Sequence, residues 1–399
     1  MENSTLLKSR SIEATLKWLG RLRRSEEYPV FAFSANSDAT IFSTCFAIFN
    51  LHLFGRIDSL SPAEKSRWIG RIQEFQNEEH GYFEPSTVFH EDVERNCFQL
   101  TCFCLSALDL LGANAKHPLT FVYQWKDADS VANFLIDRGC HKGKGGSGNK
   151  AMFLAIFLTY EYERTQDENL LEAINSWFDF HDSHSNPHGF WGQSRNDLHF
   201  HGLQNGFHQM VIYEYWKREI PGLERAADTA LRLQDQHGFF SPTPGGSACP
   251  DYDAIHLLLI AYRNINYRRA DVEKSLRKAF EALFDTCDDN GGFCQSRRRP
   301  GSLLDLLRLI PFYVSNGGPY LWYYRLRKCL GVVVKDEPYI YTGWTEIGRT
   351  WDESNLWDTW FRCSALAEIA NSIELEDNYG FRDTNFHQFI GLGFFQKIL

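Results

Sequence analysis

The hydrophobic and polar positions along this chain form two helical patterns that alternate. In one pattern, apolar residues recur every three or four positions with charged residues between them, as in SPAEKSRWIGRIQEF (61–75) and ADVEKSLRKAFEALF (270–284). The other pattern is apolar almost throughout, as in CFQLTCFCLSALDLL (97–111), AMFLAIFLTYEY (151–162) and DAIHLLLIAYR (253–263). The alternation predicts half-exposed helices that are paired with mostly buried ones.

A short loop pattern recurs between the two kinds of run. It has Gln or Asp near the end of the amphipathic run and then Gly with an aromatic residue, as in LQDQHGFF and CDDNGGFC. Its markers lie 48 to 58 residues apart and are Phe33, Gly81, Gly139, Gly189, Gly238, Gly292 and Gly343. Such a period is typical of repeat architectures in which each unit holds two helices.

The repeats predict an all-α fold, an (α/α)6-like toroid of six or seven helical hairpins with an outer ring packed around an inner one. Residues 1–399 are expected to form one toroid domain, with 373–399 as a C-terminal tail that packs on it. An open superhelical solenoid is the alternative, although its inner helices would be less uniformly apolar. All outer-to-inner loops are expected at one end of the ring.

Composition and charge narrow the classes of function. Aromatic residues make up 15% of the chain, which serves core packing or a cavity lined by rings. The net charge of −10 argues against a nucleic-acid partner. The N-terminal stretch is charged, no run of eighteen apolar residues occurs, and the ten cysteines form no CxxC pair. These features predict a cytoplasmic protein with reduced cysteines and no transmembrane segment.

The glycine-rich stretch HKGKGGSGNK (141–150) resembles a phosphate-binding loop at first sight. Gly143 and Gly148 have the Walker spacing, but Asn149 precedes Lys150 and Ala151 stands where a hydroxyl would bind magnesium. The stretch is therefore interpreted as an outer-to-inner loop rather than a nucleotide site.

A second basic loop, QSRRRPGS, contains Arg297, Arg298 and Arg299. The two basic loops are either solvated turns or a place where an anionic group of a small-molecule substrate is captured. Replacing the three arginines should then raise KM. No cofactor is required by the sequence, and Mg²⁺ is expected only if the substrate carries a diphosphate.

The stretch LQDQHGFFSPTPGGSACPDYDAIHLLLIAY (233–262) resembles squalene-hopene cyclases. Gln234 lies four residues before Gly238, as in their Gln-Trp repeat, and DYDA is similar to the Asp-rich motif that holds their general acid, with Ala254 at its fourth position. The resemblance implies a terpenoid-cyclase-like toroid in which Asp253 is the acid. Protein prenyltransferases share such a toroid, but their zinc motif has no match here.

Acidic residues recur where the apolar helices are expected to begin: Asp38, Glu91, Asp92, Asp197, Asp251, Asp253, Asp305, Asp352 and Glu353. Each could cap its helix. A toroid would instead gather them at one mouth, where grouped carboxylates raise one pKa and retain a proton near neutral pH. Asp253 is the preferred catalytic residue, with Asp251 two positions away and His256 one turn further on.

Polar and aromatic residues complete the predicted site. Six of the fourteen histidines fall between 181 and 208. A metal site at His199, His201 and His208 is an alternative, but polar lining of a substrate cavity by His201, Gln204 and His208 is preferred, so no metal is predicted. Asp38, Asp92, Glu353 and Trp357 are the other residues expected to contact substrate.

Three functions remain open from sequence. The first is a terpenoid-cyclase-like enzyme that protonates an isoprenoid-like substrate in an aromatic cavity. The second is a carbohydrate enzyme, a glycoside hydrolase, lyase or epimerase, acting on an anionic sugar. The third is a toroid that binds a ligand without catalysis.

Overall fold

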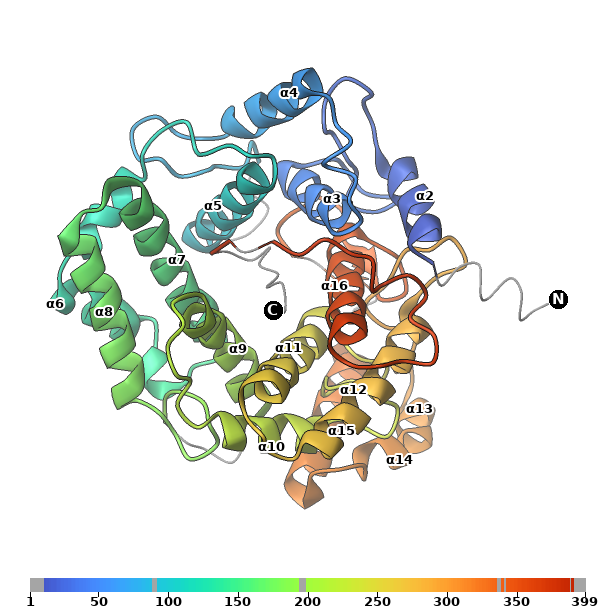
Figure 1. Cartoon of the computed structure of the whole chain (residues 1–399). Coiled ribbons are helices and arrows are strands. Elements are labelled where there is room, and N and C mark those ends of the chain that lie inside the picture. Colours follow the sequence, from blue (N-terminus) through green and yellow to red (C-terminus); the bar gives the residue numbers. More distant parts are fainter. Residues whose placement is uncertain are drawn as a thin grey trace.

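Two concentric rings of helices make up the computed structural model, which describes residues 11–87, 92–193, 199–335, 339–340, 342–387 and 389–390 (Figure 1). The outer helices are α2 (Ile12–Leu22), α4 (Pro62–Gln73), α6 (Ala128–Asp137), α8 (Glu168–Ser183), α10 (Leu223–Leu233) and α12 (Arg269–Leu283). The inner helices are α3 (Ile41–Leu53), α5 (Val93–Leu110), α7 (Ser147–Thr165), α9 (His199–Tyr215), α11 (Ala248–Asn264) and α16 (Leu356–Ser372).

The inner ring is closed. Each inner helix packs on the next in chain order, and α16 packs on both α11 and α3. The outer ring closes where the Thr15 hydroxyl of α2 donates a hydrogen bond of 2.8 Å to the Gly291 carbonyl. The predicted (α/α)6-like toroid is confirmed, with six hairpins in the described part of the chain rather than seven.

Burial follows the two sequence patterns. Phe46, Ile48 and Phe49 of α3 and Leu257 to Ile260 of α11 are fully buried, because inner helices contact both the outer ring and their neighbours. Outer helices keep one polar face, and α4 begins at a capping box formed by Ser61 and Glu64. The alternation of amphipathic and apolar runs in the sequence therefore predicts whether a helix belongs to the outer or the inner ring.

The glycine markers form tight outer-to-inner turns. Gly81, Gly189 and Gly238 have φ values of 82°, 82° and 111°, a region that side chains disfavour. The Gln234 side-chain amide donates to the Gly238 carbonyl at 3.1 Å and to the Ser275 carbonyl of α12 at 2.9 Å. The repeat glutamine thus fastens its own turn to the next outer helix.

Gln76 makes the same connection at the marker Gly81, three repeats before Gly238. Its amide donates to the Gly81 carbonyl at 3.0 Å and to the His117 carbonyl at 2.8 Å. This happens although Gln76 is one position further from its glycine than Gln234 is from Gly238. The shared role explains why both loops contain glutamine.

An insertion separates α12 from the last inner helix. It contains α13 (Leu303–Arg308), α14 (Ile310–Tyr313), α15 (Gly318–Lys335) and a two-stranded sheet of β1 (Tyr339–Ile340) and β2 (Arg349–Thr350). Short 3-10 helices precede α6, α7 and the insertion: η1 (Thr120–Trp125), η2 (Cys140–Lys142) and η4 (Phe284–Thr286). The marker Gly343 lies in this insertion, and Gly292 and Gly343 both precede the same inner helix, α16, so Gly343 does not signal a seventh hairpin.

The described part of the C-terminal segment packs where the inner helices end. The Asn385 amide donates to the Leu53 carbonyl at 2.9 Å, and Phe381 and Ile390 are buried. In Figure 1 this deep red segment lies across the near face of the ring. No helix among the described residues is both long and apolar enough to cross a bilayer.

Candidate functional site

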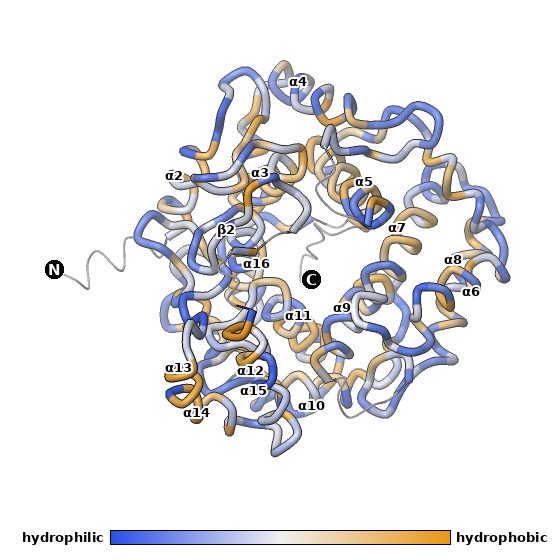
Figure 2. The backbone as a smooth tube through the Cα atoms, turned by 180° about the vertical axis from the view of Figure 1, so that it is seen from behind, coloured by the Kyte–Doolittle hydropathy of each residue, from blue (hydrophilic) through white to orange (hydrophobic). Residues whose placement is uncertain are grey.

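The inner helices all begin at the same end of the ring, which we call the mouth. The inner helices α3 to α11 each follow an outer helix through a marker loop, and α16 follows α12 through the insertion, so their N-termini point the same way. Figure 2 shows the ring from the side opposite to Figure 1, with β2 near α16 and with α13 and α15 near α12. Gly343 also lies at the mouth, because its carbonyl accepts a hydrogen bond of 3.4 Å from Asn96 near the start of α5.

A cluster of aromatic rings fills the mouth side of α3, α5 and α16. Phe46 lies 4.9 Å from Phe103, 5.1 Å from Trp344 and 5.0 Å from Trp357, measured between ring centroids. Trp357 in turn contacts Phe361 at 4.4 Å. The predicted residue Trp357 is therefore part of an aromatic wall built from three inner helices and the insertion.

Asp253 lies on the mouth half of α11 and is fully buried. Its carboxyl oxygens each accept a contact of 3.8 Å from the Cys249 thiol one turn earlier. Burial raises the pKa of Asp253 well above its usual range, and the charge of Asp251 adds to the rise. The folded protein therefore favours the protonated form of this carboxyl group more than water does.

The aromatic wall continues to the helix that carries Asp253. The Tyr252 ring lies 5.1 Å from Phe361 of α16 and 5.6 Å from Phe207 of α9. Tyr252 and Asp253 follow Cys249 by three and four residues, so each lies near Cys249 on the surface of α11. The buried Asp253 carboxyl group thus lies beside the Cys249 thiol, and the charges of His256 and Asp251 act on it.

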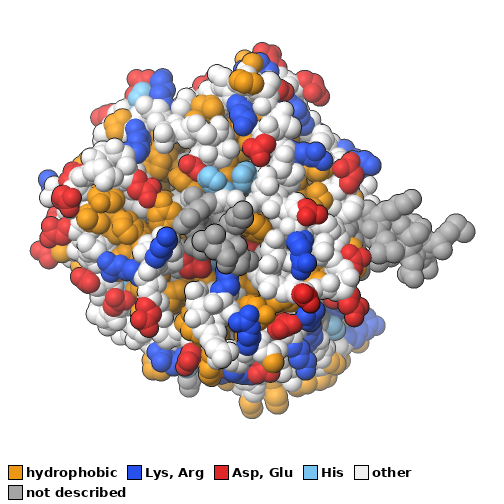
Figure 3. Space-filling view, in the orientation of Figure 1, with side chains coloured by type: hydrophobic (Ala, Val, Ile, Leu, Met, Phe, Trp, Pro, Cys, Tyr) orange, Lys and Arg blue, Asp and Glu red, His pale blue; other side chains and the backbone are white. Residues whose placement is uncertain are grey.

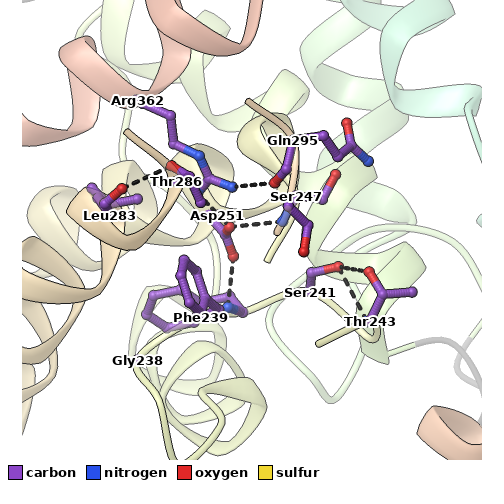
Figure 4. A network of polar contacts seen from close by, with 12 residues as sticks. Gly238, Phe239, Ser241, Thr243, Ser247, Asp251, Leu283, Thr286, Gln295 and Arg362 are labelled. Carbon is purple, nitrogen blue, oxygen red and sulfur yellow. Dashed lines mark hydrogen bonds and ion pairs between the residues drawn. The ribbon is translucent and has the colours of Figure 1, made fainter. Parts of the chain in front are cut away.

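Asp251 has a different environment from Asp253. It accepts hydrogen bonds from the backbone nitrogens of Phe240 at 2.7 Å and Ser247 at 2.8 Å, and it forms a 2.6 Å ion pair with Arg362 (Figure 4). Arg362 also donates to the Gln295 carbonyl at 3.0 Å. Asp251 therefore holds the marker loop, α11 and α16 together as a charged residue.

His256 bridges two glutamates from the neighbouring inner helices. Its Nδ1 lies 2.7 Å from Glu368 of α16 and its Nε2 lies 2.9 Å from Glu214 of α9, and all three side chains are buried. The Tyr252 hydroxyl donates to Glu368 at 2.7 Å. Burial alone would lower the pKa of His256, but Glu368 and Glu214 raise it to about 10. The imidazole is a buried cation that joins three helices.

This cation makes stability depend on pH on the alkaline side. Because the folded-state pKa of about 10 is above the ordinary 6.5, the stabilisation is complete below about pH 6.5 and declines as pH rises through 10. The free energy of unfolding from urea titrations should fall between pH 7 and pH 10. The His256→Gln variant should show a flatter dependence in this range, and an equally steep fall in the variant would contradict the assignment.

A cavity of about 970 Å³ opens at the mouth beside the insertion. The Tyr324 hydroxyl lies 3.3 Å from Nε2 of His201 at its wall. Its lining is aromatic and basic and comes largely from one side of α15: His201, Gln295, Tyr320, Tyr323, Tyr324, Arg327, Lys328, Gly331, Val332, Lys335, Tyr339, Ile340 and Trp351. His201 is the residue of the predicted set that lines this cavity.

The glycine-rich loop lines a separate cavity of about 310 Å³ with Asp92 and Lys150. Lys150 pairs with Asp92 at 3.5 Å. Asn205 of α9 accepts from the backbone nitrogens of Gly146 and Gly148, both at 3.1 Å. Two of the amides that could have held a phosphate are therefore occupied by a side chain, as the outer-to-inner loop interpretation expects.

The structure does not bring the remaining predicted residues into one cavity. Asp38 accepts from the Glu346 backbone nitrogen at 3.2 Å, and Glu353 accepts from Asn36 at 3.3 Å. His208 is buried and bonds to the Gln204 carbonyl of its own helix. Burial lowers the pKa of His208 to about 4, so it supplies an uncharged group.

Two of the three arginines at 297–299 are engaged away from the mouth cavity. Arg298 pairs with Asp285 at 3.0 Å, and Arg297 donates to the Cys287 carbonyl at 2.9 Å. These contacts lie beside η4, and neither side chain lines the mouth cavity, so anion capture by the arginine loop stays a prediction. Asp305 lies in α13 and not at the start of an inner helix.

Three predicted residues fall in parts of the chain that the structure does not describe in full. Glu91 and Asp197, and the side chain of His199, lie outside the described residues. Within the described residues, no three His, Cys, Asp or Glu side chains are grouped closely enough to hold a metal ion.

Sequence reasoning missed Glu214, Glu368, Tyr252 and Arg362. A signal was present, since Glu214, Arg362 and Glu368 are charged residues inside runs that the pattern assigns to buried helices. A buried charge requires a partner, so each of these positions could have been marked as one member of an ion pair. The partner itself could not have been identified from spacing.

Comparison with known proteins gives a likeness in structure alone. No protein-family model and no curated protein matches the chain. A variant of the type II terpene cyclase MstE from Scytonema, in complex with geranylgeranyl dihydroxybenzoate, is 13% identical over 83% of this chain and 97% of that one, with a TM-score of 0.43. A polysaccharide lyase is 9% identical over 86% and 100%, with a TM-score of 0.40. At these values neither neighbour indicates what this chain binds or converts.

Proposed function

We propose that this protein is an isoprenoid cyclase that starts its reaction by protonating a carbon–carbon double bond through Asp253. The observation that carries the proposal is the state of this carboxyl group, which is fully buried and has a pKa raised well above its usual range. A general acid must hold its proton until substrate arrives, and burial among apolar groups does this at neutral pH.

The surrounding rings fit the next step of such a reaction. A carbocation formed by protonation is stabilised by the negative faces of aromatic rings. Tyr252, Phe361, Trp357 and Phe46 form a continuous series of ring contacts from α11 to α3. Tyr252, Phe361 and Phe46 are buried, and burial of the rings would protect a cation from quenching by water.

Asp251 and the His256 group act as positioning residues in this proposal. Asp251 is held charged by Arg362, and its negative charge opposes ionisation of Asp253. His256 fixes α11 between α9 and α16 through Glu214 and Glu368. Asp251 is engaged by Arg362, and His256 has a pKa raised to about 10, so Asp253 is preferred to both as the proton donor.

A second candidate is favoured by the mouth cavity. Its wall contains Arg327, Lys328 and Lys335 and, among the described residues that line it, no carboxylate. The contact between the Tyr324 hydroxyl and His201 is a pair suited to acid–base chemistry. These features support an enzyme that acts on an anionic carbohydrate, with Tyr324 and His201 as its catalytic residues.

One experiment separates the two candidates. The purified protein is incubated with a panel of linear isoprenoids and, separately, with anionic polysaccharides, and products are analysed by mass spectrometry. The cyclase proposal expects a product of the same mass as its isoprenoid substrate, lost in Asp253→Asn and retained in Tyr324→Phe. Shortened polysaccharide chains that depend on Tyr324 and not on Asp253 would establish the second candidate instead.

A further inference from the structure

One segment of the insertion, residues 297–335, differs in charge from the rest of the chain. It contains one acidic residue, Asp305, and eight basic residues, a net charge of +7, and the other acidic residues of the insertion follow it from Asp336 onwards. Because the whole chain carries −10, the remaining residues carry −17. The basic residues are Arg297, Arg298, Arg299, Arg308, Arg325, Arg327, Lys328 and Lys335. Of these, Arg325 is buried, Arg298 pairs with Asp285 and Arg308 pairs with Asp305. A basic segment in an acidic chain is directed towards an anionic partner.

The same segment holds most of the exposed apolar side chains. Of the fourteen large hydrophobic residues that are exposed in the described part of the chain, nine lie between Leu303 and Val334. Leu303, Leu304 and Leu307 of α13 are 67%, 56% and 64% exposed. In Figure 2, α13 and α14 appear as orange segments at the rim of the ring. Such a concentration marks an interaction surface.

The exposed residues follow helical spacing, so they form faces rather than isolated positions. On α13 and α14 they are Leu303, Leu304, Leu307, Ile310 and Val314, and on α15 they are Tyr323, Leu326, Leu330 and Val334. Both α13 and α14 pack against α15. Phe312, Tyr313, Leu306 and Cys329 fill a small core between these helices. The helices of the insertion thus share a small hydrophobic core of their own. The exposed apolar side chains lie outside this core and form a separate face.

We propose that the insertion docks this protein on the surface of an anionic lipid bilayer. A short helix with leucines on one face and arginine or lysine beside them lies in the plane of a bilayer interface, and basic groups add attraction to anionic headgroups. Arg308, in the same helix as the leucines, has 70% of its side chain exposed. The acidic remainder of the chain is repelled by the same headgroups, which fixes the orientation.

Two features favour a bilayer over a second copy of this chain. A symmetric dimer through the insertion would bring two segments of charge +7 together, and like charges across an interface are costly. The face of the ring shown in Figure 3 offers no matching acidic patch for a head-to-tail contact, since positive and negative side chains are interspersed there. An anionic bilayer offers both an apolar acyl-chain region for the exposed leucines and negative headgroups for the basic residues.

The docking surface adjoins the mouth cavity. Tyr323 is 62% exposed and also lines that cavity, and Arg327 and Lys328 follow it one turn later on α15. Docking would bring the bilayer to the entrance of the cavity. This inference does not depend on Asp253, so it holds or fails separately from the proposed cyclase activity.

Vesicle sedimentation of the full chain tests the proposal. We expect binding to mixed phosphatidylcholine–phosphatidylglycerol vesicles to exceed binding to pure phosphatidylcholine by about tenfold or more and to weaken with added salt. The variant Leu303→Glu, Leu307→Glu, Ile310→Glu should lose at least about tenfold of this binding. Its circular dichroism should match wild type because these side chains are exposed.

A matched control uses exposed apolar residues outside the insertion. The variant Val93→Glu, Ile136→Glu, Ile347→Glu changes side chains that are 51%, 45% and 53% exposed and should bind vesicles as wild type does. Equal loss in both variants, or no binding of wild type to anionic vesicles, would overturn the proposal. The proposal would also be overturned if light scattering showed that the wild type is a dimer, that the leucine variant is a monomer, and that the wild type does not bind vesicles.

Discussion

Replacing Asp253 with asparagine is expected to lower the turnover of an isoprenoid substrate by about two to four orders of magnitude, the usual contribution of a general acid. Asparagine has nearly the shape of a protonated aspartic acid but cannot release a proton to carbon. Because Asp253 is buried and its pKa is raised well above its usual range, an uncharged amide of the same shape should leave the free energy of unfolding little changed. Steady-state rates of product formation by mass spectrometry measure the effect.

The control for this variant is an aspartate of the same chemistry on the surface. Asp129→Asn, on the exposed side of α6, should keep wild-type turnover. Retention of activity in Asp253→Asn, with a normal unfolding curve, would remove the general acid from the proposal. Loss of activity accompanied by unfolding would be judged against Asp253→Glu, which keeps the acid and should recover part of the rate.

Replacing Arg362 with leucine is expected to destabilise the fold by about 3–5 kcal/mol, because it leaves a buried carboxylate without its ion-pair partner. The side chains of Arg362 and Asp251 are 0% and 1% exposed, and their charged atoms are 2.6 Å apart. The two backbone nitrogens that also bond to Asp251 offset part of the loss. Urea unfolding followed by circular dichroism measures the change.

Arg298 provides the matched comparison. It pairs with Asp285 at 3.0 Å, but both side chains are 40% or more exposed, so Arg298→Leu should cost less than about 1 kcal/mol. Adding Asp251→Asn to Arg362→Leu should recover stability, because the unpaired charge is removed. Equal effects of the two arginine variants would show that the buried pair does not hold α11 to α16.

The ring of helices could be predicted because the sequence pattern that specifies each hairpin lies within that hairpin. Each hairpin repeats one hydrophobic pattern and one turn. The turn requires glycine because its backbone is left-handed and closely packed. At Gly189, for example, a Cβ would lie 2.3 Å from the Ala226 backbone nitrogen. The insertion could not be separated from the ring in this way. Its helices follow ordinary helical spacing, and Gly343 falls on the period although its loop joins other elements.

The site was only partly predictable because its contacts join distant parts of the chain. Asp253 could be singled out from DYDA, but its neighbour Asp251 is engaged by Arg362, 111 residues later. His256 meets Glu214 and Glu368, which are 42 and 112 residues away. The acidic residues on equivalent loops occupy similar positions in the repeat, so the sequence does not distinguish one from another. Asp38 accepts from the Glu346 backbone 308 residues away, and Glu353 accepts from the Asn36 amide 317 residues away. Which of the acids becomes buried depends on packing that sequence spacing does not reveal.

The most direct test of the proposed reaction is the origin of the proton. The protein is incubated in D₂O with an isoprenoid that it converts, and the product is analysed by mass spectrometry and NMR. Protonation by Asp253, which exchanges with solvent before each turnover, predicts one carbon-bound deuterium in every product molecule and no labelled product from Asp253→Asn. A product formed in D₂O without carbon-bound deuterium, or the same labelling rate in Asp253→Asn, would contradict the proposal.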